Sequence, residues 1–423
     1  MNPHLPPAHA PAELSDLANH TLSSPSPSPS QSPSQSPQSH LESFSDVADF
    51  VARHAPEHFA FLYRPHLLKR QSELFLKHFP GKTLYAVKCN PHPVILHDLM
   101  QAGILHFDVA SSHEINLVQS IRPDAHCFFM HPVKSPGAID QAWSQGICDY
   151  VIDHQDELAK LYRIIPARAH RDLRIFVRMA LPDLGALVDL SCKFGAHPEQ
   201  AESLLQAVEQ GGSEPGLAFH VGTQIPSAKA YRKAIQLAAR TLHKARISCH
   251  HFDIGGGFPV GYANINVESP AQMLRDVRTA LEAYGLERDM QLYCEPGRAM
   301  VGESMSLLVQ IHARRNQQLY INCGRYHGML EMSLMELRHP VRLVRRSGLV
   351  EAEHHAMEDF VIQGATCDSL DRLAMTIALP GDVREGDWIE FGRCGSYSTS
   401  LITDFNGIEG GTVVTVGDRQ PPC

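Results

Sequence analysis

The sequence lacks the patterns that mark several common classes of protein. It has no run of about 18 apolar residues, the length that spans a membrane as a helix, and no basic-then-apolar signal pattern at its N-terminus. Its ten cysteines form no CxxC pair, so neither a zinc site nor a disulfide framework is indicated. The formal charge of −9, without a face-forming run of lysine and arginine, argues against a nucleic-acid partner. We therefore expect a cytoplasmic protein with no metal, no membrane contact and no nucleic acid.

The N-terminus also lacks apolar side chains. The stretch 22–40, "LSSPSPSPSQSPSQSPQSH", has almost nothing to bury, so we expect residues 1–44 to be a disordered tail. The whole chain of 423 residues is 43% hydrophobic and 20% charged, an ordinary globular composition with room for two sizeable cores. We predict domains at 66–300 and 301–423, with 45–65 joining the second of them.

Short β-like runs alternate with helical patterns in the first of these domains. Apolar runs, each followed by a segment with apolar side chains at helical spacing, predict a parallel sheet covered by helices. Eight such units in roughly 220 residues fit a closed (β/α)8 barrel better than an open sheet. The eight runs are 83–87, 106–110, 126–130, 149–153, 174–179, 217–221, 251–255 and 291–295.

After residue 300 the pattern becomes rich in β-like runs separated by turns. With hardly any helical stretch between them, these runs predict an all-β domain of sandwich or barrel type, to which the segment 58–64 could add a strand. The predicted fold class is therefore an α/β barrel followed by a C-terminal all-β domain. The runs are 306–313, 318–324, 340–346, 359–365, 387–393, 400–405 and 412–417.

Polar residues fall at the carboxyl ends of the predicted barrel strands, where barrels of this type carry their chemistry. Taken singly, Lys88 could be a solvated strand end and His220 a hydrogen-bonded core histidine. Glu295 and Arg298 could likewise form a structural ion pair. Random placement would rarely bring so many such residues to one mouth, and the full set is Lys88, Asp108, Arg178, His220, the turn 253–259, Glu295 and Arg298.

Together these residue types suit one cofactor, pyridoxal 5'-phosphate (PLP). A partly desolvated lysine can form a Schiff base with an aldehyde, and an acid can keep a pyridine nitrogen protonated. Gly255, Gly256 and Gly257 allow backbone N–H groups to approach phosphate oxygens. Their turn is not a Rossmann fingerprint, because GxGxxG is absent, and no Gly-Lys-Ser/Thr follows it as in a Walker loop.

The order of nine motifs resembles the fold-type III PLP-dependent decarboxylases, the group that contains ornithine, diaminopimelate and some arginine decarboxylases. The resemblance covers about residues 45–420. It implies an alanine-racemase-like barrel, release of CO2 from an L-amino acid to give an amine, and a head-to-tail homodimer with shared active sites. The motifs are "YAVKCN", "FDVASSHE", "LSCKFGA", "HVGTQ", "DIGGGFP", "EPGR", "ATCDSLDR", "GDWIEFG" and "FNG".

The resemblance also implies a role for each residue of the predicted site. Lys88 looks like the Schiff-base lysine, Asp108 its neighbouring acid, and His220 the residue that stacks on the ring. Glu295 looks like the partner of the pyridine nitrogen, and Arg178 a contact near the ring hydroxyl. The phosphate and ring clasp would then consist of Thr223, Gly255, Gly256, Gly257, Gly297, Arg298 and Tyr397.

Two further residues look like contributions from the other subunit. By resemblance, Cys367 is the proton donor and Asp368 a substrate contact, so that one subunit alone would lack a complete site. The predicted catalytic residues are then Lys88, His220, Glu295 and Cys367.

One departure from the family pattern leaves the substrate open. Ornithine-type members carry an aspartate in a "DG" pair, but "YINCGRYHGMLE" (320–331) has Cys323 there and Arg325 two residues on. A thiol does not pair with an ammonium as a carboxylate does. Asp368 or Glu331 could still provide the anion for a diamine-type substrate. Alternatively, Arg325 with His327 meets a carboxylate, as in a citryl-amino-acid conjugate of siderophore biosynthesis or in diaminopimelate.

Two rival interpretations remain. Alanine racemase shares the cofactor fold, but its tyrosine base has no clear counterpart in this sequence. A non-catalytic homologue of the antizyme-inhibitor kind would bind a regulator instead of a substrate. Retention of Lys88, Glu295, Arg298 and Cys367 argues against that second alternative.

Overall fold

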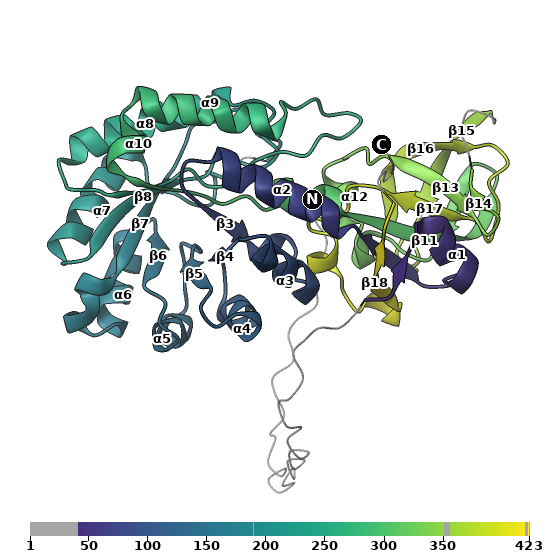
Figure 1. Cartoon of the computed structure of the whole chain (residues 1–423), viewed down its shortest axis with the longest axis horizontal. Helices are drawn as coiled ribbons and strands as arrows, with labels where there is room; N and C mark the ends of the chain where they lie inside the picture. The colour runs from purple at the N-terminus through teal and green to yellow at the C-terminus, as the bar shows by residue number, and fades with distance from the viewer. Residues whose placement is uncertain (1–40, 189, 351–355, 419–421, 423) are drawn as a thin grey trace, which may run out of the picture. The chain divides into compact units, whose positions relative to one another are not determined.

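The computed structural model describes residues 41–188, 190–350, 356–418 and 422 (Figure 1). Most of the predicted tail, residues 1–40, therefore lies outside the described residues. The predicted tail extends too far, because Ser43–Phe44 form the short strand β1, which pairs with β18 (Gly410–Val416). Phe44 is buried there and packs edge-on against Phe50, with ring centroids 4.9 Å apart, which supplies the burial that a disordered tail lacks.

Eight parallel strands close the predicted barrel, and each overlaps one of the runs expected from the sequence. Strand β10 pairs with both β9 and β3, which joins the two ends of the sheet. The predicted (β/α)8 barrel is thus confirmed. Its strands are β3 (Lys82–Ala86), β4 (His106–Val109), β5 (His126–Phe129), β6 (Asp149–Ile152), β7 (Arg174–Met179), β8 (Glu214–Phe219), β9 (His251–Asp253) and β10 (Gln291–Cys294).

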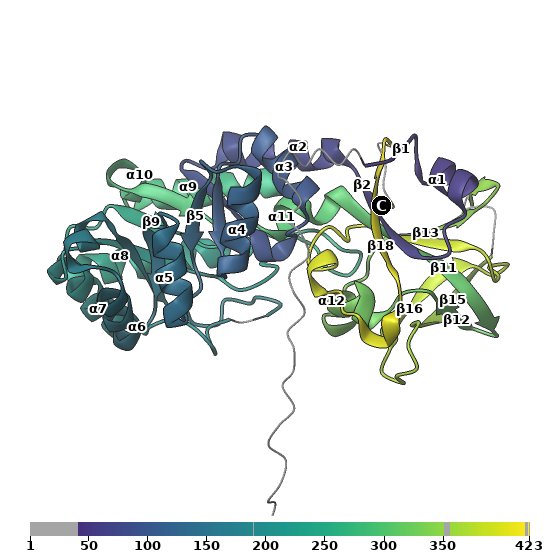
Figure 2. The same ribbon diagram turned by 90° about the horizontal axis from the view of Figure 1, so that it is seen from below.

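Helices lie outside the barrel strands (Figures 1 and 2). Several begin where the sequence places a cap: the hydroxyls of Ser111, Ser135 and Ser269 each accept a hydrogen bond from a backbone N–H of the first turn. Each helix buries one face against the strands. They are α2 (Pro65–His78), α3 (Pro93–Gln101), α4 (Ser112–Ile121), α5 (Pro136–Ser144), α6 (Gln155–Ile164), α7 (Pro198–Gln210), α8 (Lys229–Ala245), α9 (Pro270–Ala283) and α10 (Leu286–Asp289).

A second sheet is built from the two ends of the described chain. Strand β2 (Phe59–Tyr63) lies antiparallel to β11 (Met305–Arg315) and parallel to β18, which confirms that the segment 58–64 adds a strand. Helix α1 (Val47–His54) covers part of this sheet with Val47 and Val51. The remaining strands are β12 (Gln318–Ile321), β13 (Val341–Arg345), β14 (Gly348–Leu349), β15 (Met357–Gln363), β16 (Arg372–Pro380) and β17 (Trp388–Phe391).

The strand prediction for 400–405 is wrong. The short 3-10 turns η6 (Thr399–Leu401) and η7 (Phe405–Gly407) occupy this stretch, and Leu401 and Phe405 remain exposed. Without a neighbouring strand or core to cover them, these apolar residues do not form a sheet edge. Strand β16, which the sequence pattern did not predict, pairs instead with β15 and buries Leu373, Ile377 and Leu379.

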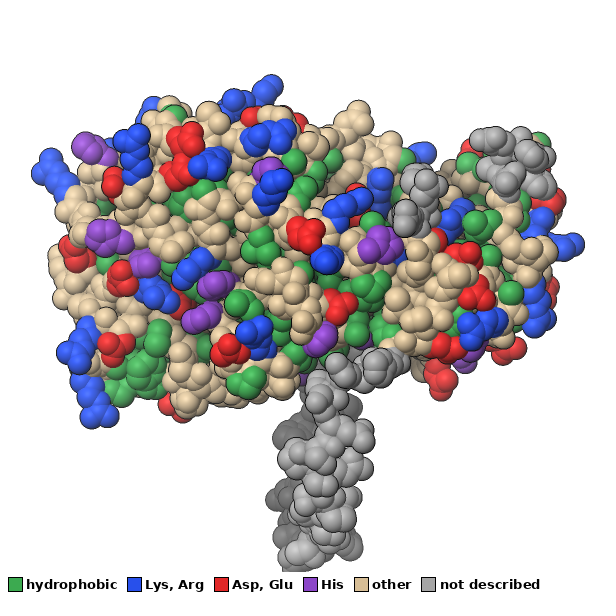
Figure 3. Space-filling model, in the orientation of Figure 1, with side chains coloured by type: hydrophobic (Ala, Val, Ile, Leu, Met, Phe, Trp, Pro, Cys, Tyr) green, Lys and Arg blue, Asp and Glu red, His purple; other side chains and the backbone are tan. Residues whose placement is uncertain are grey.

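The described residues from 41 onward belong to one compact unit, so the division at residue 300 stays a prediction. Within the described ranges, no helix is long and apolar enough to cross a membrane, and no group of His, Cys, Asp and Glu side chains is arranged to hold a metal ion. Figure 3 shows charges of both signs interspersed over the visible face.

Candidate functional site

Most of the residues predicted at the barrel mouth line one cavity, although Asp108 and Arg178 do not. Loops that follow strands β3, β8, β9 and β10 supply most of its walls, because parallel strands bring their carboxyl ends to the same side. The region beyond β17 adds Tyr397, whose backbone N–H donates to the carbonyl of Cys89 at 2.8 Å. The lining residues are Ala86, Lys88, His220, Thr223, Gln224, Gly257, Phe258, Glu295, Gly297, Arg298 and Tyr397.

Lys88 lies in a 3-10 turn (η1, Val87–Cys89) directly after β3 and contacts the acid predicted to be its neighbour. Its Nζ lies 2.5 Å from Oδ2 of the buried Asp108, which lies near the end of the adjacent strand β4. Burial lowers the pKa of Lys88, but Asp108, Tyr397 and Glu295 together more than offset this effect and raise the pKa above the usual range. The other carboxylate oxygen of Asp108 has no hydrogen-bond partner. A polar atom without a partner in so buried a place indicates room for a further polar group.

His220 follows β8 with its ring above the glycine-rich turn. Its Nδ1 accepts a hydrogen bond from the N–H of Gly222 at 3.1 Å. Burial, together with the charges of Arg178 and Lys88, holds the pKa of His220 well below its usual range. The imidazole is therefore a neutral, flat surface at neutral pH.

Close packing restricts the turn after β9 to glycine. A Cβ on Gly255 would lie 2.1 Å from the carbonyl oxygen of Phe219, and one on Gly257 would lie 2.3 Å from that of Gly222. Both glycines have positive φ, 65° and 103°. On Gly256 a Cβ would approach the carbonyl oxygen of Glu295 to 2.6 Å and Nε2 of His220 to 3.0 Å. A side chain in this turn would therefore displace walls of the cavity.

Glu295 is buried beside a second carboxyl group. Burial and the neighbouring Asp253 and Asp108 raise the pKa of Glu295 well above its usual range. Burial raises the pKa of Asp253 to about 7, although the N–H of Gly255 donates to its Oδ1 at 2.8 Å. Two adjacent buried carboxyl groups do not both ionise readily, so the pair holds a proton near neutral pH.

Arg298 begins the short helix α11 (Arg298–Val301) and lies at the other end of the cavity. Its Nη1 donates to Oε2 of Glu331 at 2.6 Å, to the hydroxyl of Ser396 at 3.1 Å and to that of Tyr262 at 3.3 Å. Its Nη2 donates to the other oxygen of Glu331. Burial lowers the pKa of Arg298, but Tyr262 and Glu331 more than offset this, so the guanidinium stays charged.

Of two further predicted cofactor contacts, one lines this cavity and the other does not. Thr223 lines it, and its backbone N–H donates to the carbonyl of Val188 at 3.0 Å. Arg178, within β7, does not line the cavity as it stands; its guanidinium lies over the ring of Phe194 at 5.5 Å, and burial lowers its pKa.

The residues predicted to meet the substrate are not brought into this cavity. Cys323 is fully buried and its thiol donates to the carbonyl of His327 at 3.1 Å. Arg325 donates through Nη2 to Ser333 at 2.8 Å. In the loop 364–371, Cys367 is exposed and lies 3.5 Å from Oδ1 of Asn406, while Asp368 accepts from the hydroxyl of Tyr326. The substrate roles of Cys323, Arg325, Cys367 and Asp368 therefore stay predictions.

Sequence reasoning gave no role of their own to Gln224 and Asp253, and it considered Glu331 only as an anion for the substrate. Gln224 joins two loops, because its side chain both donates to the carbonyl of Val260 and accepts from its N–H at 2.8 Å. Asp253 and Gln224 both lie inside motifs that were recognised, so their polar side chains were an available signal. The pairing of Glu331 with Arg298 had no local signal, since 33 residues separate them.

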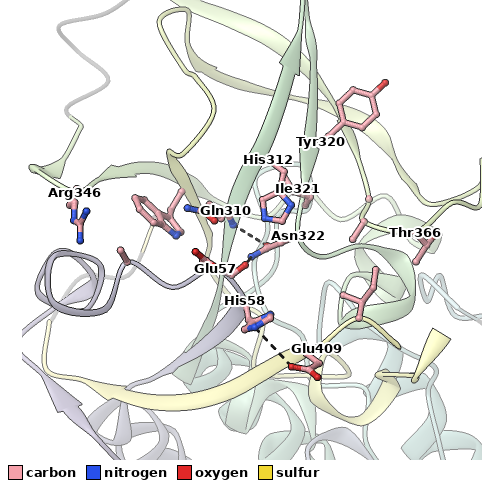
Figure 4. Close-up of a pocket in the computed structure, with 15 residues that line it drawn as sticks. Glu57, His58, Gln310, His312, Tyr320, Ile321, Asn322, Arg346, Thr366 and Glu409 are labelled. Atoms are coloured by element: carbon pink, nitrogen blue, oxygen red, sulfur yellow. Dashed lines mark hydrogen bonds and ion pairs between the residues drawn. The ribbon is translucent and has the colours of Figure 1, made fainter. Parts of the chain in front are cut away.

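A larger cavity of about 750 Å³ lies in the second sheet and contains none of the predicted site residues (Figure 4). The side chain of Asn322, which lines this cavity, donates a hydrogen bond to the carbonyl of Glu57 at 2.8 Å. His58 and Glu409 form a long ion pair of 4.0 Å there, with both side chains mostly exposed. The chemistry predicted for this protein belongs to the smaller cavity at the barrel mouth.

The residues of the smaller cavity fit PLP. They offer an amine at Lys88, a protonated carboxyl pair at Glu295, a neutral ring at His220 and a charged guanidinium at Arg298, with a glycine turn between them. The unpartnered oxygens of Asp108 and Asp253 leave polar capacity that a cofactor can use.

Comparisons with known proteins agree with this chemistry. Residues 66–302 match the family described as "Pyridoxal-dependent decarboxylase, pyridoxal binding domain". Ornithine decarboxylase of Schizosaccharomyces pombe is 32% identical over 349 residues, which cover 78% of this chain and 76% of that one. Antizyme inhibitor 2 of Xenopus laevis is 30% identical over 360 residues, covering 79% of this chain and 76% of that one.

A solved structure also resembles this one closely. The arginine decarboxylase of Paramecium bursaria Chlorella virus superimposes with a TM-score of 0.78 at 26% identity, covering 88% of this chain and 99% of that chain. The match extends through both the barrel and the second sheet.

Proposed function

Because this chain belongs to the pyridoxal-dependent decarboxylases, we propose that its barrel-mouth cavity releases CO2 from the α-carboxylate of an ornithine-, lysine- or arginine-type L-amino acid. It is a carboxy-lyase whose cofactor is PLP. The observation that carries the assignment of the site is the meeting of Lys88, His220, Glu295 and Arg298 around one cavity.

The proposed roles follow from the chemistry of each side chain. When bound, PLP supplies an aldehyde carbon for an amine and a pyridine ring that accepts electrons. Lys88 provides the amine, and Asp108 fixes its position through the 2.5 Å contact. The raised pKa of Glu295 keeps a proton available at its carboxyl group, where a pyridine nitrogen can share it.

The remaining cavity residues bind and orient. The neutral ring of His220 stacks on an aromatic face without adding charge. Arg178 serves the ring hydroxyl. The phosphate and the ring would be held by Thr223, Gly255, Gly256, Gly257, Gly297, Arg298 and Tyr397, because a charged guanidinium and backbone donors suit an anion.

Two copies of the chain complete the site in this proposal. Cys367 and Asp368 lie in the loop 364–371 outside this chain's own cavity, so a head-to-tail homodimer brings them to the cavity of a second copy. There Cys367 donates the proton that replaces CO2, and Asp368 contacts the substrate tail. A cytoplasmic location remains part of the proposal.

The ionic state of the substrate tail separates two versions of the proposed activity. For a cationic tail, Asp368 is the remaining acid, because Glu331 is already paired with Arg298. The relatives named ornithine and arginine decarboxylase support this version. For a carboxylate tail, as in a citryl-amino-acid conjugate or diaminopimelate, Arg325 is the counter-ion once it leaves Ser333. An antizyme-inhibitor-like binder is the third alternative, supported by one relative of that name.

A substrate panel tests the proposal. Purified, PLP-loaded protein is assayed for CO2 release from ornithine, lysine, arginine, meso-diaminopimelate and O-citryl-L-serine. Turnover of a cationic amino acid supports the first version, and turnover only of a carboxylate-bearing substrate supports the second. Retention of PLP without turnover of any of them favours the binder.

A further inference from the structure

We propose that Glu331 is the internal counter-ion of Arg298 when no phosphate is bound, and that its negative charge weakens the protein's affinity for the phosphate group of PLP. This inference rests on the proposed role of Arg298 as the phosphate ligand. In this inference Glu331 affects the binding of the cofactor and does not contact a substrate ammonium, the role considered above.

The geometry identifies Glu331 as a two-point partner of the arginine. Both terminal nitrogens of Arg298 donate to the two carboxylate oxygens of Glu331, the end-on arrangement that an arginine otherwise offers to a phosphate. The two side chains are 4% and 11% exposed, so little water competes for either charge. Among the described residues, Glu331 is the only carboxylate in an ion pair with Arg298.

Arg298 and Glu331 differ in their position relative to the cavity. Arg298 lines the cavity at the barrel mouth, whereas Glu331 does not. Glu331 lies on helix α12 (Leu330–Leu334), which packs against β16 of the second sheet. The carboxylate therefore contacts Arg298 from outside the cavity lining.

The other partners of the guanidinium carry no charge. The hydroxyls of Tyr262 and Ser396 accept from Nη1, and burial raises the pKa of Tyr262 to about 12, so its phenol stays neutral. The thiol of Cys89, whose pKa is also raised by burial to about 12, is neutral as well. Among the residues that the structure describes, Glu331 is thus the one ion-pair partner that compensates the buried charge of Arg298.

The energetic consequence has a definite sign. A buried guanidinium without a counter-ion is unfavourable, so a phosphate that supplies the missing charge gains much. With Glu331 present, Arg298 is already compensated, and the incoming phosphate meets a second negative charge across the same guanidinium. Glu331 thus stabilises the cofactor-free protein and lowers its preference for the phosphorylated cofactor.

The test compares PLP with pyridoxal, which lacks the phosphate. Glu331→Gln keeps the shape and removes the charge. We expect it to bind PLP about tenfold tighter than the wild type, the scale of one charge-assisted hydrogen bond, with pyridoxal affinity unchanged. The cofactor-free variant should melt at a lower temperature, and inorganic phosphate should raise its Tm more than that of the wild type.

Two further variants keep the test sharp. Glu331→Asp retains the charge at a greater distance and should shift PLP affinity in the same direction by less, which serves if the Gln variant does not fold. Glu73→Gln is the matched control, since Glu73 is an exposed glutamate paired only loosely with Lys69 at 3.9 Å. It should change neither affinity.

The inference is overturned if Glu331→Gln binds PLP no tighter than the wild type, or if PLP and pyridoxal gain equally. Failure of the proposed function looks different. In that case the wild-type protein itself would hold no PLP that borohydride can reduce onto Lys88, and no variant at Glu331 would restore it.

Discussion

The barrel mouth and the loops of the second sheet differ in whether a single chain brings their predicted site residues to the cavity. At the mouth, residues from strands far apart in the sequence reach one cavity, because every parallel strand ends there. In the second sheet, Cys323 is buried, Cys367 is exposed, and neither lines that cavity. A closed barrel thus brings its polar strand ends together by topology alone, whereas the position of residues on the loops of the second sheet depends on what packs against them.

The largest expected effect tests the mouth. Lys88→Ala should lower CO2 release by about 10³-fold or more, because no other amine lines the cavity among the described residues. Lys82→Ala is a matched control at the opposite end of the same strand, where its ammonium lies 5.9 Å from the centroid of the Tyr293 ring. Activity assays and borohydride labelling of both variants provide the measurement. If Lys88→Ala is still labelled by reduced cofactor, the assignment of the amine is wrong.

Mixing two inactive variants tests whether the loops of the second sheet complete the site of another copy of the chain. Lys88→Ala and Cys367→Ala should each be nearly inactive as homodimers. Their co-expressed mixture should recover about a quarter of wild-type activity, because half of the random dimers carry one intact site. Heterodimers purified through two different tags should show about half of wild-type activity, which checks this directly. No recovery in a verified heterodimer would mean that Cys367 serves the cavity of its own chain or none.

A third prediction contrasts the buried Arg64 with the buried Arg298, which lines the cavity. Arg64, which directly follows strand β2, is fully buried, donates to Glu390 and Asp418 at 2.8 Å, and does not line the cavity. Arg64→Met should lower the free energy of unfolding by about 3 kcal/mol, because Glu390 and Asp418 lose a partner, and should leave the ratio of PLP to pyridoxal affinity unchanged. Urea unfolding and cofactor titration separate the two effects. A changed ratio would show that the sheet network reaches the mouth.

Much of the fold followed from the sequence, because its signals were local. The eight barrel runs were apolar and ended at polar residues, and segments with apolar side chains at helical spacing followed them. The segment 400–405 misled because the apolar character of Leu401 and Phe405 predicts burial that the structure does not provide. The partner of Arg298 was inaccessible for another reason: it requires knowing how α12 packs beside the barrel.

The smallest expected effect concerns the proton that Asp253 and Glu295 share at the barrel mouth. Burial raises the pKa of Asp253 to about 7, above its value in an unfolded chain, so the folded state binds this proton more tightly. The resulting contribution to stability is present at low pH and is lost as pH rises through the folded pKa, by about 1 kcal/mol per pH unit. Asp253→Asn should therefore make the stability of the cofactor-free protein less dependent on pH between about 4 and 7. Urea midpoints at several pH values measure this, and an unchanged slope would place the shared proton on Glu295 alone.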